Sequence, residues 1–140
     1  MPVNEVFLDT WALLAIVNRA DAFHQTALEL NKKLSVGRTL LVTSDWVLTE
    51  FLSSASRPPV RTGATEFVSA LRSSTRITVI EATRNDWERV FAFFASHSDK
   101  AWSFVDCSSM LLCRDRNIRG VFTAHRHFEQ FGLEILVKHG

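Results

Sequence analysis

The chain has 140 residues, of which 46% are apolar and 11% aromatic, and this composition excludes an intrinsically disordered protein. The length favours one domain with a sizeable buried core. A formal net charge of +1 excludes a strong overall field that draws the protein to nucleic acid or membrane, so any polyanion binding must rest on local arginine clusters.

The first half of the chain alternates between predicted strands and helices. In chain order the pattern predicts a strand at Glu5–Leu8, helices at Thr10–Asn18 and Ala22–Leu34, a strand at Leu40–Val42 and a helix at Asp45–Ser54. We expect Gly37 to cap the end of the second helix. The segment Arg57-Pro58-Pro59 is expected to end the third.

The second half continues the alternation. It is predicted to contain a helix at Gly63–Arg72, a strand at Ile77–Ile80, helices at Asn85–Ala95 and Ser103–Arg116, and strands at Gly120–Thr123 and Leu133–Val137. Strands separated by helices indicate βαβ units. We therefore expect one domain over residues 1–140, of the α/β class, with three α/β/α layers and a mostly parallel sheet of four to five strands.

Asp9 is the most informative residue, because it directly follows the apolar strand Val6-Phe7-Leu8 and precedes a helix. Open α/β folds bind ligands beyond the carboxyl ends of their parallel strands, so this carboxylate lies where chemistry is expected. The simpler interpretation is that Asp9 only caps the helix that follows it.

Glu50 and Asp106 are the acids that could meet Asp9. Asp106 begins a helix that is apolar nearly all round, so its carboxylate either points into a crevice or serves as the capping partner of Ser103. Glu50 lies beside the apolar stripe of its helix, where a solvated side chain is the plain alternative. Carboxylates that gather at one sheet edge repel one another unless divalent cations neutralise them. Oxygen-only ligands suit Mg²⁺ or Mn²⁺, which predicts a metal-assisted phosphoryl-transfer site.

Four segments, in order, resemble the successive motifs of a PIN domain: Val6–Thr10, Thr43–Glu50, Asp99–Cys107 and Val121–Phe128. The small size is similar to that of VapC-type toxins from toxin–antitoxin pairs. The resemblance implies a Mg²⁺- or Mn²⁺-dependent endoribonuclease that cleaves single-stranded or structured RNA with a metal-activated water. It also implies a homodimer and a cognate antitoxin protein as partner.

The same resemblance assigns roles to individual residues. Asp9, Glu50 and Asp106 fall on the three catalytic and metal-binding acids, and His125 falls on the fourth metal-binding position, which is commonly Asp. The auxiliary positions fall on Thr10, Ser103, Thr123 and Asp99. Because imidazole is a poor ligand for Mg²⁺ and a better one for Mn²⁺, we expect His125 to favour the softer metal, to leave one bound ion instead of two, or to weaken the site.

His125 keeps other interpretations open. The chain could be a catalytically weakened PIN-like module that binds RNA or protein. A zinc site that combines His125 and His127 with Cys107 or Cys113 is a further alternative, although its spacing fits no standard pattern. A phosphohydrolase with Asp9 as nucleophile is disfavoured, because Trp11 stands where such enzymes need a second Asp.

RNA contacts and location complete the expectations. Trp102 is the best candidate for stacking on a base. Phosphate contacts are expected among Arg57, Arg61, Arg84, Arg89, Arg116, Arg119 and Arg126. No apolar run approaches the ~20 residues that a membrane span needs, and no signal-peptide pattern opens the chain. Two cysteines too poorly placed to bridge each other fit a cytoplasmic protein with no membrane association.

Overall fold

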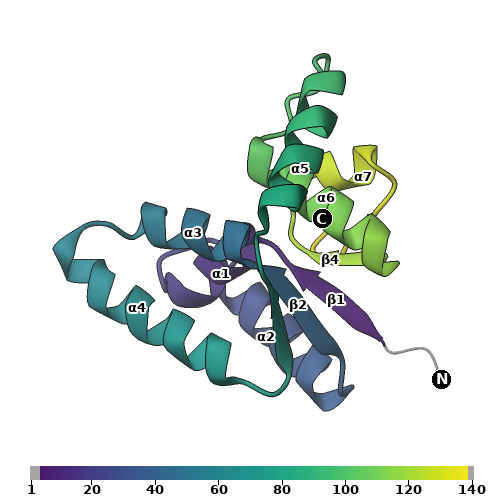
Figure 1. The fold of residues 1–140 in the computed structure, drawn as a ribbon. Coiled ribbons are helices and arrows are strands. Elements are labelled where there is room, and N and C mark those ends of the chain that lie inside the picture. Colours follow the sequence, from purple (N-terminus) through teal and green to yellow (C-terminus); the bar gives the residue numbers. More distant parts are fainter. Residues whose placement is uncertain (1–3, 139–140) are drawn as a thin grey trace.

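The computed structural model describes residues 4–138, which form a three-layer α/β/α fold around a parallel sheet (Figure 1). The strands are β1 (Glu5–Leu8), β2 (Leu40–Ser44), β3 (Ile77–Ile80), β4 (Gly120–Phe122) and β5 (Glu134–Ile135). Their order in the sheet is β3-β2-β1-β4-β5, and every pairing is parallel. The predicted fold class is confirmed. The single domain over residues 1–140 stays a prediction, and residues 1–3 and 139–140 lie outside the described part.

Helices connect the strands and cover the sheet. They are α1 (Thr10–Val17), α2 (His24–Val36), α3 (Asp45–Ser54), α4 (Pro58–Ser73), α5 (Arg84–Ser96), α6 (Phe104–Arg116) and α7 (His127–Gln130). Figure 1 shows α5, α6 and α7 grouped apart from α1 to α4. Large apolar side chains from strands and helices fill the core between the layers, among them Phe7, Phe51, Phe122 and Phe128. Within residues 4–138, no helix is long and apolar enough to cross a membrane.

The strand order places a topological switch point between β1 and β4. The chain builds outward from β1 through β2 to β3, then returns to the other side of β1 to form β4 and β5. Leu8 pairs with Phe122 at the end of this central pair, so Asp9 and Thr123 each stand one residue past the register. This is the crevice in which open parallel sheets bind ligands.

Several helix boundaries differ from the prediction, and two of the differences have a clear local cause. Helix α2 begins at His24 rather than Ala22, because the Asp21 side chain accepts a hydrogen bond from the Phe23 N–H at 2.8 Å and holds a turn before the helix. Pro58 and Pro59 do not merely end α3. They are the first residues of α4, where the missing proline N–H costs nothing because no helical partner exists for it.

Candidate active site

Asp9 is a buried carboxylate, only 3% exposed, at the carboxyl end of β1. Its backbone occupies the N-cap position of α1, but its side chain makes no capping hydrogen bond. Instead, the Thr123 Oγ1–H donates to Asp9 Oδ2 at 2.8 Å across the β1–β4 switch point. Thr123 Oγ1 in turn accepts the His125 N–H at 3.1 Å. The interpretation of Asp9 as a simple helix cap is therefore wrong.

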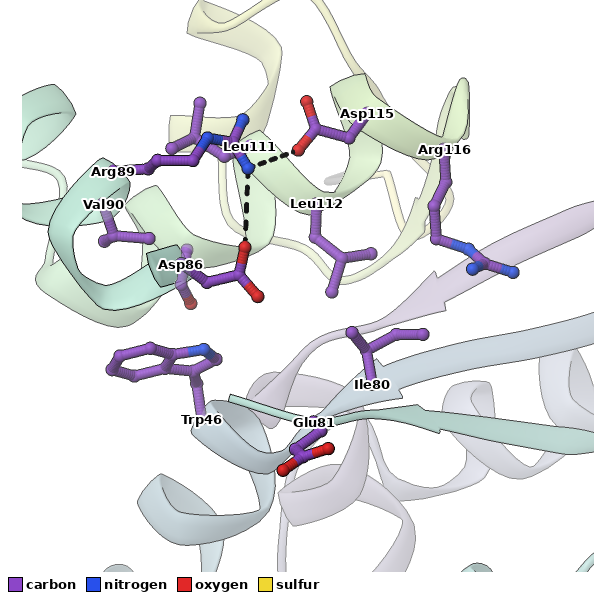
Figure 2. A pocket seen from close by; sticks show the side chains of 11 residues that line it. Trp46, Ile80, Glu81, Asp86, Arg89, Val90, Leu111, Leu112, Asp115 and Arg116 are labelled. Carbon is purple, nitrogen blue, oxygen red and sulfur yellow. Dashed lines mark ion pairs between the residues drawn. The ribbon is translucent and has the colours of Figure 1, made fainter. Parts of the chain in front are cut away.

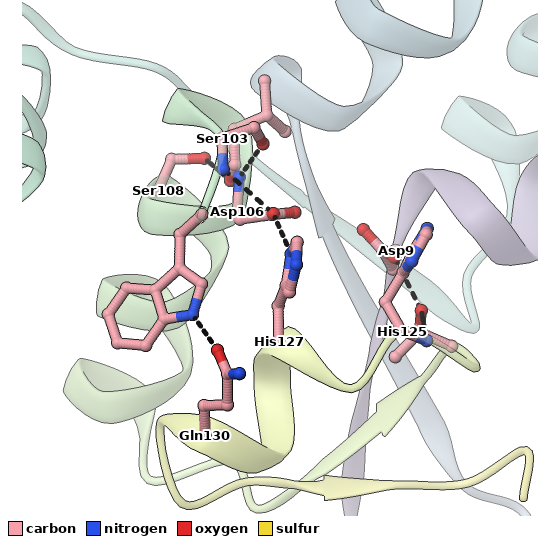
Figure 3. Close-up of polar contacts among 10 residues, drawn as sticks. Asp9, Ser103, Asp106, Ser108, His125, His127 and Gln130 are labelled. Atoms are coloured by element: carbon pink, nitrogen blue, oxygen red, sulfur yellow. Dashed lines mark hydrogen bonds and ion pairs between the residues drawn. The ribbon is translucent and has the colours of Figure 1, made fainter. Parts of the chain in front are cut away.

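Asp106 combines both roles that the sequence left open. It forms a capping box with Ser103, in which each side chain accepts the backbone N–H of the other residue, at 2.9 Å and 3.1 Å. The Asp106 Oδ2 atom, which accepts the Ser103 N–H, also lies 3.1 Å from His127 Nδ1 (Figure 3). The Asp106 side chain is 17% exposed, so it is partly desolvated while it caps α6.

Burial raises the pKa of Asp9 from its ordinary value of 3.8 to about 7. Burial is the largest cause, and the negative charges of Asp106 and Glu50 raise the pKa further, while the hydrogen bond from Thr123 acts in the opposite direction. Electrostatic interaction with both acids puts the three predicted carboxylates in one neighbourhood. Their mutual repulsion is the property expected of a site that receives a cation.

The predicted site residues meet in one cavity of ≈ 300 Å³, here called the acidic cavity. Its lining includes Asp9, Thr10, Glu50, Ser103, Asp106 and His125. Glu50 and His125 are exposed at its mouth, whereas Asp9 and Thr10 are buried. Thr123 does not line the cavity but contacts two residues that do, Asp9 and His125. Asp99 is not brought to the cavity: its side chain is 74% exposed and pairs with the Lys100 ammonium at 3.4 Å.

The donors around the acidic cavity are mostly oxygens. Thr10 Oγ1 is buried without a hydrogen-bond partner in the described structure, so one polar atom at the cavity wall is still able to form a hydrogen bond. Carboxylate and hydroxyl oxygens suit Mg²⁺ or Mn²⁺. Within residues 4–138, no three His, Cys, Asp or Glu side chains are already gathered around one point where a metal ion could bind.

His127 is a cavity residue that the sequence did not reveal. The sequence suggested His127 only as part of the zinc alternative, yet His127 lines the acidic cavity and contacts Asp106. The His125 and His127 rings lie nearly parallel with their centroids 6.2 Å apart. The available signal was position: a polar side chain a few residues beyond a strand at this sheet edge.

Two other predictions about individual side chains are wrong. Trp102 is buried and cannot stack on a base, since its Nε1–H donates to Gln130 Oε1 at 2.8 Å and its ring lies against Phe93 and Phe131. The zinc alternative also fails, because Cys107 and Cys113 are buried in the core and neither lines the cavity that His125 and His127 share. Cys107 and Cys113 are buried free thiols.

A second hollow, of ≈ 150 Å³, lies between α5, α6 and the end of β3 (Figure 2). Figure 2 shows the Arg89 guanidinium between two carboxylates, at 2.9 Å from Asp115 and 3.5 Å from Asp86. Arg116, another predicted phosphate contact, pairs with Glu5 at 2.9 Å. These two arginines tie elements of the fold together. Arg126 is exposed and stands in the sequence between His125 and His127, which line the acidic cavity.

Comparisons with known proteins agree with this architecture. Residues 6–133 match the PIN domain family. The chain is 29% identical over 130 residues to the "23S rRNA-specific endonuclease VapC20" of Mycobacterium tuberculosis, which covers 91% of this chain and 94% of that protein. A crystal structure of M. tuberculosis VapC20, described as a "Sarcin-Ricin loop cleaving toxin", superposes with a TM-score of 0.78 at 27% identity over 91% of this chain and 95% of that one. The DNA-bound VapBC structure from Salmonella typhimurium shares the fold, with a TM-score of 0.66 at 16% identity over 96% and 97% of the two chains.

Proposed function

Because this chain belongs to the PIN-domain family, we propose that it is a metal-dependent endoribonuclease and the toxin of a toxin–antitoxin pair. The observation that carries the proposal is the buried Asp9 carboxylate, which shares a cavity with Asp106 and Glu50 and has its pKa raised to about 7. The similarity to VapC20, an RNA endonuclease, over nine-tenths of both chains supports the same reaction class.

Asp9, Asp106 and Glu50 would hold a divalent cation, Mg²⁺ or Mn²⁺. When bound, such a cation neutralises the acids, polarises the scissile phosphate and lowers the pKa of a water. Thr123 holds Asp9 through one oxygen, and Ser103 holds Asp106 through one oxygen, so each carboxylate keeps a second oxygen for the cation. Glu50 is exposed and would have to turn inward, and the unpartnered Thr10 hydroxyl can orient a bound water.

The side chains around the acidic cavity favour attack by water over a covalent enzyme intermediate. The Ser103 hydroxyl oxygen accepts the hydrogen bond that caps α6, and the Thr123 O–H donates a hydrogen bond to Asp9. Burial raises the pKa of the Cys107 thiol to about 11, which keeps it protonated and unreactive at neutral pH. Arg126, an exposed residue between His125 and His127 in the sequence, is available to contact an RNA phosphate.

The test is cleavage of a purified RNA stem-loop that carries the sarcin–ricin loop sequence, beside an unstructured RNA of equal length. Wild type, Asp9→Ala and Asp106→Asn are compared with Mn²⁺, with Mg²⁺ and with EDTA. Asp86→Asn, an exposed acid of α5 that lines the other hollow, is the matched control. We expect cleavage by wild type and the control only, and only with metal. Equal rates in all four proteins end the proposal.

The weakened module remains the alternative, favoured by His125 at the cavity mouth where the family commonly has Asp. His125→Asp separates the two. Robust cleavage by wild type excludes the module, whereas an inert wild type that gains strong activity from His125→Asp supports it.

We propose two protein partners as well. A toxin needs an inhibitor, so a cognate antitoxin is expected to cover the acidic cavity. A second copy of the chain is expected on the outer face of α5, where Trp87, Phe91 and Phe94 are 37%, 51% and 42% exposed and follow helical spacing. Sedimentation of Phe91→Glu tests the dimer, since a charge on that face should yield a monomer.

The proposed RNA substrate and the free thiols fit a cytoplasmic enzyme.

A further inference from the structure

One short segment after β4 contacts two acids of the cavity, the buried Asp9 and the half-buried Asp106. The Thr123 Oγ1–H donates to Asp9 Oδ2 at 2.8 Å, and His127 Nδ1 lies 3.1 Å from Asp106 Oδ2 (Figure 3). Each contact uses one carboxylate oxygen and leaves the other oxygen outside the bond. The segment therefore fixes how both carboxylates are rotated.

The direction of the His127 contact follows from the chemistry of the acceptor. Asp106 Oδ2 already accepts the Ser103 N–H at 3.1 Å. An ionised carboxylate oxygen can only accept, so the His127 Nδ1 must carry the hydrogen. Donors from two separate elements, the N-terminus of α6 and the first residue of α7, converge on one oxygen. Two donors hold the carboxylate more firmly than the capping box does alone.

Helix α7 is itself fixed, so His127 has a rigid base. Phe128 is fully buried in the core, and Gln130 accepts the Trp102 indole N–H at 2.8 Å. The His127 side chain is 36% exposed and does not fill the core. Its replacement should therefore leave the fold intact while it changes the environment of Asp106.

We propose that His127 is a positioning residue of the nuclease reaction. Its Nδ1–H holds Asp106 Oδ2, so that the remaining oxygen of Asp106 is presented to the acidic cavity and to a divalent cation. The inference rests on the proposed function, and it adds a residue that the motif comparison does not assign. Partners that orient a metal-binding carboxylate typically change metal affinity or activity by roughly 10- to 100-fold.

The experiment compares His127→Asn with His127→Leu. The Asn amide can place an N–H close to the position of Nδ1, whereas Leu has a similar size and no donor. The matched control is His24→Leu, because His24 Nδ1 also contacts an oxygen, that of Ala15 at 2.8 Å, but lies outside the acidic cavity. The readouts are the Mn²⁺ dissociation constant by electron paramagnetic resonance, kcat and KM for RNA cleavage, and Tm.

We expect His127→Leu to weaken Mn²⁺ binding and kcat at least about tenfold with little change in KM, and His127→Asn to stay within about threefold of wild type. Equal Mn²⁺ affinity in wild type and His127→Leu, with wild type active, overturns the positioning role and leaves the nuclease intact. An equal loss in both variants also overturns it, because the imidazole itself would then matter. A wild type that neither binds Mn²⁺ nor cleaves RNA overturns both proposals.

A measurement on the metal-free protein tests the hydrogen bond directly. The nitrogen chemical shifts of His127 should show the hydrogen on Nδ1. A tautomer with hydrogen on Nε2 alone overturns the inference, because Nδ1 could not then donate to Asp106.

Discussion

Two of the hollows that acidic side chains line in the described part of the chain differ in whether an arginine accompanies the acids. Between α5 and α6, Asp86 and Asp115 flank Arg89, and the hydrogen bond with Asp115 is the main cause that raises the pKa of the guanidinium. The acidic cavity has no Lys or Arg among its lining residues in the described part of the chain, and burial raises the pKa of Asp9 to about 7. A candidate cation site is therefore indicated by acids that lack a neighbouring Lys or Arg, and not by the number of acids.

The largest expected effect comes from removing the uncompensated acid. Asp9→Asn keeps the size of the side chain and its ability to accept from Thr123, but removes the charge that a cation needs. We expect RNA cleavage to fall at least on the order of a thousandfold, measured as initial rate at saturating Mn²⁺. Asp115→Asn, in the compensated hollow, should cleave at the wild-type rate. A mild loss in Asp9→Asn would remove the contrast between the two hollows.

The same acid should make the metal-free protein less stable as pH rises. The folded state keeps the Asp9 proton up to about pH 7, whereas the unfolded chain releases it near 3.8. The folded state therefore binds more protons in this window, so the free energy of unfolding falls as pH rises from about 4 to about 7 and levels off above it. At about 1.36 kcal/mol per pH unit, the largest possible loss is about 4 kcal/mol.

Urea unfolding in EDTA across this pH range measures the effect. The slope assigned to Asp9 should vanish in Asp9→Asn, which should exceed wild type in stability at pH 8. An identical pH profile in the two proteins would mean that Asp9 ionises freely in the folded state.

Metal choice should respond to His125. Imidazole binds Mn²⁺ better than Mg²⁺, so wild type should be activated more by Mn²⁺, and His125→Asp should shift the preference toward Mg²⁺ by roughly tenfold. The ratio of cleavage rates at saturating Mn²⁺ and Mg²⁺ is the measurement. Equal activation of wild type by both metals would argue against imidazole as a ligand.

The smallest effect is expected in the compensated hollow. Arg89→Gln removes ion pairs whose side chains are about two-fifths exposed, so solvent already screens them. We expect a loss of about 1 kcal/mol or less in the free energy of unfolding and no change in RNA cleavage. A loss in the free energy of unfolding as large as the one expected from Asp9 would show that the ion pairs of Arg89 are not weak.

The fold was predictable because local patterns and the sheet agree. Strand positions, the Ser103–Asp106 capping box and the placement of Asp9 beyond β1 all follow from short stretches of sequence. Pro58 and Pro59 were predicted to end a helix, yet they begin α4, because proline both ends one helix and suits the first turn of the next.

Contacts between distant side chains were harder to foresee. Trp102 stands in an exposed-looking loop, but Phe93, Phe131 and Gln130 cover it from two other helices and the turn after α7. His127 reads as packing beside Phe128, and only the seating of α7 against α6 brings it to Asp106. The grouping of Asp9, Glu50 and Asp106 was predictable because it follows from the order of strands and helices. Their hydrogen-bond partners were not, because tertiary packing decides them.

The bond from Thr123 to Asp9 spans 114 positions of the chain. Ribosomes make protein from the N-terminus, so Asp9 is translated well before its hydrogen-bond donor. A nascent chain that still lacks β4 has an incomplete sheet on one side of β1 and no hydrogen bond from Thr123 to Asp9. The contact that orients the Asp9 carboxylate can therefore form only after β4 and Thr123 have been synthesised, long after Asp9 itself.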